Sequence, residues 1–293
     1  PKTFEGLTIH HWNRGSGKDQ YAKKNKKRFD LYEGIFRAIR SIPEGEDILI
    51  VHRKPDGEMA DIQSELRERL HGRRGLSFCT WGSYTATNEF VSCRHIILAS
   101  LLQYNTPHNE GLGRSAKKLP TESRLIEADF DGTRLGEIAH HIYQAANRGA
   151  IRSLIGESCP PDCHLYMVFD PKQVPLSVLG RVFPGATIED WVPVYRVSGN
   201  QRKLADLLDA EARAGGAEHS KSHYRDQLGI SKQSFSKLLN ANLFGYLSVE
   251  RGVDIIDHGK QLEILPSTKD KVAISGQAPQ FSTTEIADWA EVF

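Results

Sequence analysis

Short apolar runs that alternate with amphipathic helical stretches constrain the fold of this 293-residue chain more than any other feature. The strand-like runs are residues 7–12, 47–52, 75–80, 94–100 and 164–170. The helical stretches are residues 28–41, 58–71, 132–155 and 175–182, with a polar linker over residues 100–130. Strands that alternate with helices form parallel βαβ units with helices on both faces of a sheet. The sequence therefore predicts an α/β domain whose function gathers at the carboxyl ends of its strands.

The character of the chain changes near Ser198. Residues 199–247 have helical spacing throughout, and residues 246–250 and 261–265 read as a two-stranded ribbon around two glycines. We expect an α/β domain over residues 1–197, a smaller helical domain over 198–266 and a polar tail over 267–293, which ends in a short amphipathic piece.

Composition narrows the class of protein. Hydrophobic residues at 39% and charged residues at 26% are typical of a globular chain with a core. No apolar run reaches the roughly 18 residues of a membrane span, and no signal-peptide pattern opens the chain. Four cysteines in so long a chain do not form a disulfide scaffold. We therefore expect a cytoplasmic protein without a membrane partner, and the first residue, Pro1, suggests a fragment of a longer one.

Gln144, Arg148 and Arg152 follow one another at intervals of four residues. On a helix over residues 132–155 they would form one polar ridge. The planar guanidinium group of arginine can hold phosphate oxygens in a bidentate manner, so such a ridge suits a phosphate site. A solvated polar helix face is the alternative interpretation.

A polar segment, Thr80 to Phe90, follows the predicted strand at residues 75–80. Its threonines, Ser83, Gly82 and Asn88 offer hydroxyl groups, an amide and close backbone approach to a phosphate or a sugar. A plain loop is the alternative.

Three segments together resemble a known family. In order along the chain, Ile48-Leu-Ile-Val-His52-Arg-Lys, Thr80 to Phe90 and Gln144 to Arg152 are similar to motifs IV, V and VI of superfamily 2 (DEAD/DEAH-like) helicases. The resemblance covers about residues 1–197 and implies the second, C-terminal RecA-like lobe of such a motor, a parallel sheet with flanking helices.

The resemblance also implies roles for individual residues. Arg148 would be the arginine finger that reaches the γ-phosphate, with Gln144 and Arg152 beside it in the catalytic set. Thr87 and Asn88 would connect to the nucleotide site. The nucleic-acid contacts would come from the ends of two strands, at Thr80, His52, Arg53 and Lys54.

The sequence lacks a phosphate cradle of the form GxxxxGK[ST] and a DExx box after an apolar strand. In the helicase interpretation, ATP and Mg²⁺ bind mainly to a first RecA-like lobe that this sequence does not contain. That lobe is then an expected partner, and this chain alone is expected to be inactive as an ATPase.

The second domain carries a separate pattern. Residues 223–239 have the helix–glycine turn–helix form of a helix-turn-helix, followed by a ribbon that suggests a winged-helix-like domain. Lys232, Gln233 and Lys237 are the expected nucleic-acid contacts of its second helix. Domains of this kind also serve as protein-interaction modules, which remains an alternative.

Two further groups of residues give weaker evidence for a binding site. Cys159, Cys163 and His164 have no second Cys/His pair at zinc-ligand spacing, so we expect no metal there. Residues 1–40 carry ten Lys/Arg against four Asp/Glu, a balance of +6, which fits either a solvated surface or a phosphate track.

The sequence thus favours the C-terminal part of a nucleic-acid-dependent ATPase or helicase, acting in replication, repair or the metabolism of mobile-element or phage DNA. DNA is the expected partner, and RNA is not excluded. The alternatives are a DNA-binding winged-helix regulator whose α/β domain senses a ligand or a protein, and a non-catalytic interaction module.

Overall fold

The computed structural model describes residues 2–83 and 88–267. The chain divides into two compact units, Pro1–Pro193 and Val194–Phe293, at a boundary close to the expected one at residue 197. The predicted nucleotide contact Thr87 and the expected tail from residue 268 onward lie outside the described residues.

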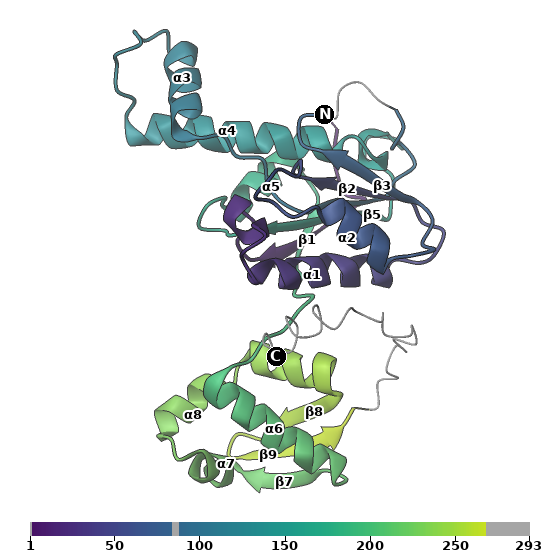
Figure 1. Cartoon of the computed structure of the whole chain (residues 1–293), viewed down its shortest axis with the longest axis vertical. Helices are drawn as coiled ribbons and strands as arrows, with labels where there is room; N and C mark the ends of the chain where they lie inside the picture. The colour runs from purple at the N-terminus through teal and green to yellow at the C-terminus, as the bar shows by residue number, and fades with distance from the viewer. Residues whose placement is uncertain (1, 84–87, 268–293) are drawn as a thin grey trace. The chain divides into compact units, whose positions relative to one another are not determined.

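The first unit is an α/β domain built on a six-stranded parallel sheet, as the alternation of strands and helices predicts (Figure 1). The strand order is β3-β2-β4-β5-β1-β6. The elements, in chain order, are β1 (Leu7–Asn13), the 3₁₀ helix η1 (Lys18–Tyr21), α1 (Lys27–Ser41), β2 (Ile48–His52), α2 (Ile62–Arg69), β3 (Leu76–Thr80), β4 (His95–Leu98), α3 (Thr106–Ala116), α4 (Glu127–Ala146), the 3₁₀ helix η2 (Ala150–Arg152), β5 (Cys163–Phe169), α5 (Leu176–Val182) and β6 (Thr187–Asp190).

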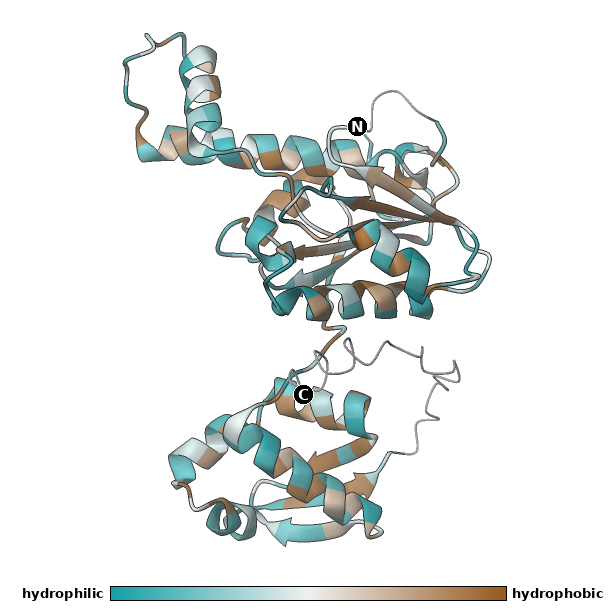
Figure 2. Cartoon of the chain, viewed as in Figure 1, coloured by the Kyte–Doolittle hydropathy of each residue, from teal (hydrophilic) through white to brown (hydrophobic). Residues whose placement is uncertain are grey.

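Helices cover both faces of this sheet, α1 and α2 on one face and α4 and α5 on the other (Figure 1). Alternate strand residues point to opposite faces, so Ile9 and Leu165 join the core beneath α4 and α5. Trp12, on the other face of β1, packs against Gly34 of α1. The apolar strands are therefore buried from both sides, and the polar faces of the helices remain outside (Figure 2).

The predicted helix over residues 132–155 is wrong at both ends. Helix α4 begins at Glu127 and ends at Ala146. Beyond it, the amides of Arg148 and Gly149 bond to carbonyl groups three residues back, and the chain then turns away. The expected linker after residue 100 also contains a helix, α3, which packs on the first half of α4 and projects with it beyond the sheet (Figure 1).

The second unit combines helices with a three-stranded antiparallel sheet of order β7-β9-β8. Its elements are α6 (Gly199–Arg213), β7 (Ala217–Ser220), α7 (Lys221–Leu228), α8 (Lys232–Leu238), α9 (Ala241–Gly245), the π-helix η3 (Tyr246–Arg251), β8 (Val253–Asp257) and β9 (Gln261–Pro266).

Three predictions for this unit can be compared with the structure. The helix–glycine turn–helix is confirmed, because α7 ends at Gly229 in the left-handed conformation (φ 63°) and Ser231 caps α8. The ribbon is displaced: Tyr246 and Leu247 lie in η3, where they are buried in the core, and the first ribbon strand starts at Val253. The region expected to be helical throughout contains a strand, β7, which the ribbon pairs with.

The close packing of α1 on β1 gives a test of the fold. A Cβ atom at Gly34 would lie 2.3 Å from Trp12 Cζ3 and 2.9 Å from Pro193 Cγ. We expect Gly34→Ala to lower the free energy of unfolding by about 1–3 kcal/mol, because the buried ring and the helix must separate. Urea denaturation of the purified chain measures this change.

Gly136→Ala is the matched control, since Gly136 lies within α4 with open space around it. There the substitution should raise stability by up to about 1 kcal/mol through helix propensity. Equal effects at the two glycines would contradict the packing of α1 on Trp12.

Candidate functional site

The segments that resemble motifs V and VI meet in the structure. The amide of Ala150, at the start of η2, donates a hydrogen bond of 2.8 Å to the carbonyl of Cys93, just before β4. Arg152 Nη2 donates to Asn88 Oδ1 at 2.8 Å, across 64 residues of sequence. Two candidate nucleotide-site residues from different segments are therefore in direct contact.

The turn that carries the two arginines is held from several sides. Gly149 packs so closely on β4 that a Cβ atom there would lie 2.6 Å from the Cys93 carbonyl oxygen and 2.7 Å from Ile96 Cδ1. Lys2 Nζ donates to the Ile151 carbonyl at 2.6 Å and to Asn147 Oδ1 at 3.3 Å. Nothing in the local sequence points to Lys2, because its partners lie more than 140 residues away.

Gln144, Arg148 and Arg152 do not share one helix face, which corrects the ridge expected from their spacing. Gln144 lies in the last turn of α4, Arg148 in the turn that follows and Arg152 in η2. Arg148 is partly buried near Cys79 of β3. Burial raises the pKa of the Cys79 thiol, and the positive charge of Arg148 opposes that rise. The chain leaves the helix after Ala146, and the Ala150 amide bonds to Cys93 instead of continuing it, so no ridge forms.

The expected nucleic-acid contacts at the carboxyl end of β2 differ in their exposure. His52 is buried, and its Nδ1 lies 2.9 Å from the Arg53 carbonyl oxygen. Burial lowers the pKa of His52, which keeps the ring neutral at neutral pH. Arg53 is partly buried and donates to the Leu101 carbonyl at 2.7 Å, whereas Lys54 is exposed. Of the three, only Lys54 presents its side chain fully to solvent.

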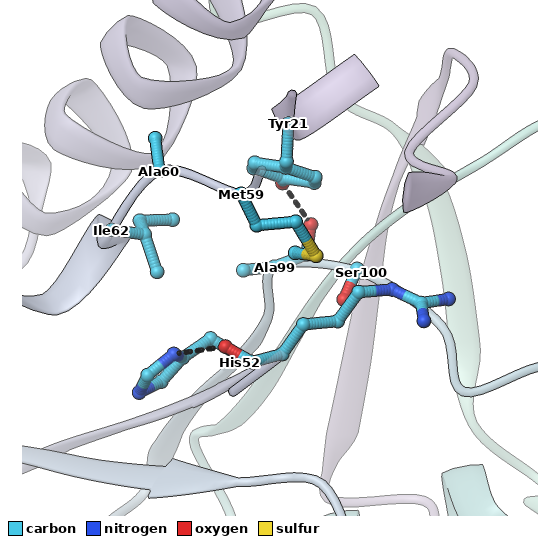
Figure 3. A pocket seen from close by; sticks show the side chains of 8 residues that line it. Tyr21, His52, Met59, Ala60, Ile62, Ala99 and Ser100 are labelled. Atoms are coloured by element: carbon cyan, nitrogen blue, oxygen red, sulfur yellow. Dashed lines mark hydrogen bonds between the residues drawn. The ribbon is translucent and has the colours of Figure 1, made fainter. Parts of the chain in front are cut away.

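A small cavity lies at the carboxyl ends of β2 and β4, lined by Tyr21, His52, Met59 and Ser100 among others (Figure 3). Tyr21 of η1 crosses it and donates a hydrogen bond to the Ala99 carbonyl. Its volume of about 10 Å³ holds roughly one water molecule and is far too small for a nucleotide. Thr80, at the end of β3, donates instead to Ser83 Oγ at 2.8 Å.

In the second unit, Lys232, Gln233 and Lys237 are exposed on α8, whose Phe235 turns into the core. Neither lysine forms an ion pair with another residue that the structure describes. Two cations of the preceding helix are neutralised: Lys221 pairs with Asp257 at 2.7 Å, and Arg225 pairs with Asp226 at 2.7 Å. The available positive charge of this helix pair therefore lies on α8.

Three histidines that look scattered in the sequence form a row across the sheet. His164 of β5 stacks on His95 of β4, with ring centroids 4.9 Å apart and planes 5° from parallel. On its other side, His164 Nδ1 lies 3.0 Å from Nε2 of His10 in β1. The three histidines come from three different strands, and only the strand order brings them together.

No protein-family model matches the chain, and no curated protein matches it either. Within residues 2–83 and 88–267, no helix has both the length and the apolar character needed to cross a bilayer.

The histidine row predicts a pH dependence of stability. Burial, followed by the neighbouring His164, lowers the pKa of His95 to about 4, and burial also lowers the pKa of His10. Unfolded histidine has a pKa of about 6.5, so between these values the unfolded chain binds protons that the folded chain excludes. The contribution of neutral His95 to the free energy of unfolding should therefore be fully present above pH ~6.5. As the pH drops towards 4, the free energy of unfolding should fall by about 1–3 kcal/mol because of His95.

Thermal or urea unfolding across this pH range measures the loss. His95→Phe keeps an aromatic ring against His164 and removes the titrating group, so its profile should be flatter than that of the wild type. Parallel profiles would show that His95 does not carry the effect.

Proposed function

We propose that this chain is the second RecA-like lobe and a winged-helix-like domain of a superfamily 2 nucleic-acid-dependent ATPase or helicase. Arg148 acts as the arginine finger in this proposal. Gln144 and Arg152 assist it, and ATP with Mg²⁺ is held mainly by a first lobe outside this sequence.

The contact between Arg152 and Asn88 is the observation that carries the proposal. In the helicase interpretation, the segments of Asn88 and Arg152 both serve the nucleotide site, so they must lie together. A solvated polar ridge would need no such contact with a loop 64 residues away. Arg148 is partly buried in the turn between α4 and η2, and restricted motion of its side chain supports a role in transition-state stabilisation.

Exposed apolar side chains beside this turn support the presence of a neighbouring protein surface. Leu154 and Ile155, just beyond the Ser153 cap of η2, are 57% and 63% exposed. Tyr143, one residue before Gln144, is 40% exposed. Contiguous exposed apolar patches mark protein–protein contact, and in this proposal a first lobe across the nucleotide cleft covers these side chains.

The arrangement of the second unit supports the winged-helix part of the proposal. The helix-turn-helix of α7 and α8 is followed by the β8–β9 hairpin, which pairs with β7 in one antiparallel sheet. In such domains the second helix enters the major groove and the hairpin forms the wing. Lys232, Gln233 and Lys237 then face DNA from α8.

A DNA-binding regulator is the second candidate, and the exposed cations of α8 favour it equally. It differs from the motor in one respect, because only the motor requires Arg148 for ATP turnover.

In the protein that carries both lobes, we expect Arg148→Ala to lower kcat for nucleic-acid-stimulated ATP hydrolysis by about 10³–10⁵-fold. The Kd for nucleotide should change far less, because the finger acts on the charge of the transition state. Steady-state kinetics and nucleotide titration measure the two effects.

Arg181→Ala is the control, since Arg181 is an exposed arginine of α5 in the same unit. Normal turnover in the Arg148 variant would remove the arginine-finger assignment and leave the regulator.

For the second unit, we expect Lys232→Glu combined with Lys237→Glu to weaken binding of duplex DNA. Each lysine that neutralises a phosphate contributes about 0.9 to the slope of log affinity against log salt concentration. The double variant should therefore flatten that slope by roughly two units, which fluorescence anisotropy across a salt series measures.

Lys203→Glu makes the same charge change at an exposed position of α6 and should affect affinity much less. Unchanged affinity in the double variant would assign α8 to protein contact instead of DNA contact.

A further inference from the structure

A cluster of two histidines and one glutamate in the second unit has the composition of a zinc site. Glu211 comes from α6, His219 from β7 and His223 from α7 (Figure 1). One ligand atom from each lies within 4.8 Å of the others. Among the described residues, this is the group of three or more metal-ligating side chains that meets this spacing.

The distances within the cluster fit a single ion. Glu211 Oε1 lies 3.6 Å from His219 Nε2 and 4.0 Å from His223 Nε2. Nitrogen and oxygen ligands about 2.0–2.2 Å from a tetrahedral zinc are roughly 3.4 Å from one another. The three atoms therefore lie close enough for one ion to reach all of them once the side chains turn towards it.

A buried tyrosine orients the glutamate. The hydroxyl of Tyr224, which is fully buried, donates to Glu211 Oε2 and leaves Oε1 directed at the histidines. Metal-ligating carboxylates are held in this way by a second hydrogen-bonding partner.

The two imidazole rings are accessible but lie face to face, so at least one ring must turn before both Nε2 atoms point to one ion. They stack with centroids 4.3 Å apart and planes 23° from parallel. The side chains of His219 and His223 are 41% and 39% exposed, so an ion can reach them from solvent. Gln227 Nε2 lies 2.7 Å from His223 Nε2, and this amide must rotate away, or turn its oxygen to the ion, when a metal binds.

We propose that Glu211, His219 and His223 bind one Zn²⁺ ion, with a water molecule or Gln227 in the fourth position. Two imidazole nitrogens and one carboxylate are a set that zinc accepts, whereas Mg²⁺ prefers oxygen ligands alone. The ion links α6, β7 and α7. It therefore fastens the first helix of the helix-turn-helix to the rest of the unit.

Isothermal titration of the metal-free 293-residue chain with Zn²⁺ tests this proposal. We expect saturable binding at this site, visible absorption bands of tetrahedral Co²⁺ when cobalt replaces zinc, and a higher Tm with zinc than with a chelator. Mg²⁺ should have none of these effects. Absence of Zn²⁺ binding by the wild-type chain would overturn the proposal.

Variants identify the ligands. His219→Ala and His223→Ala should each lower zinc affinity by more than the roughly 10–100-fold that loss of a supporting partner costs. Tyr224→Phe, which removes only the hydroxyl that holds Glu211, should fall within that range. His258→Ala is the matched control, because His258 pairs with Glu263 at 2.9 Å but lies outside the three-residue cluster.

The control should bind zinc as the wild type does, and circular dichroism verifies that each variant is folded. Binding that persists unchanged in both the His219 and His223 variants would place the ion elsewhere and refute the site.

Discussion

The hydrogen bond from the Ala150 amide to the Cys93 carbonyl is the interaction on which the candidate nucleotide site depends. It holds the turn that follows the end of α4 at Ala146 against the segment before β4, and η2 beyond this turn brings Arg152 to Asn88. The bond is possible because Gly149 has no Cβ atom to collide with Cys93 and Ile96. A buried backbone amide needs a partner, and here the partner comes from the segment before β4 instead of the preceding turn of helix.

The cavity at β2 and β4 and the region around η2 differ in the space and the side chains that they offer a ligand. At the carboxyl ends of β2 and β4, Tyr21 fills the space and leaves a cavity of about 10 Å³ (Figure 3). Beyond the end of α4, cationic, amide and exposed apolar side chains gather around η2. Open α/β sheets commonly bind ligands at their carboxyl ends, but this unit offers no room for a nucleotide in that cavity. A site at η2 would need a second protein surface to complete it.

In the second unit, charge is distributed unevenly between the two helices of the helix-turn-helix. The cations of α7 are engaged with Asp257 and Asp226, whereas those of α8 are exposed. The proposed zinc ligands lie on α6, β7 and α7, so metal binding would stabilise the support of α8 without occupying its exposed face. The two proposals thus concern different side chains and can fail separately.

The sequence by itself determined the α/β class, five of the six strands of the parallel sheet and the turn at Gly229, because these follow from local periodicity and from the conformational freedom of glycine. It misplaced the end of α4 and the ribbon, and it did not reveal β7. Only the tertiary structure decided that Arg152 contacts Asn88, that Lys2 holds the η2 turn, and that Glu211 meets two histidines. These contacts join residues from different elements, most of them far apart in the chain, and their geometry is set by strand order and packing, which local sequence patterns do not encode.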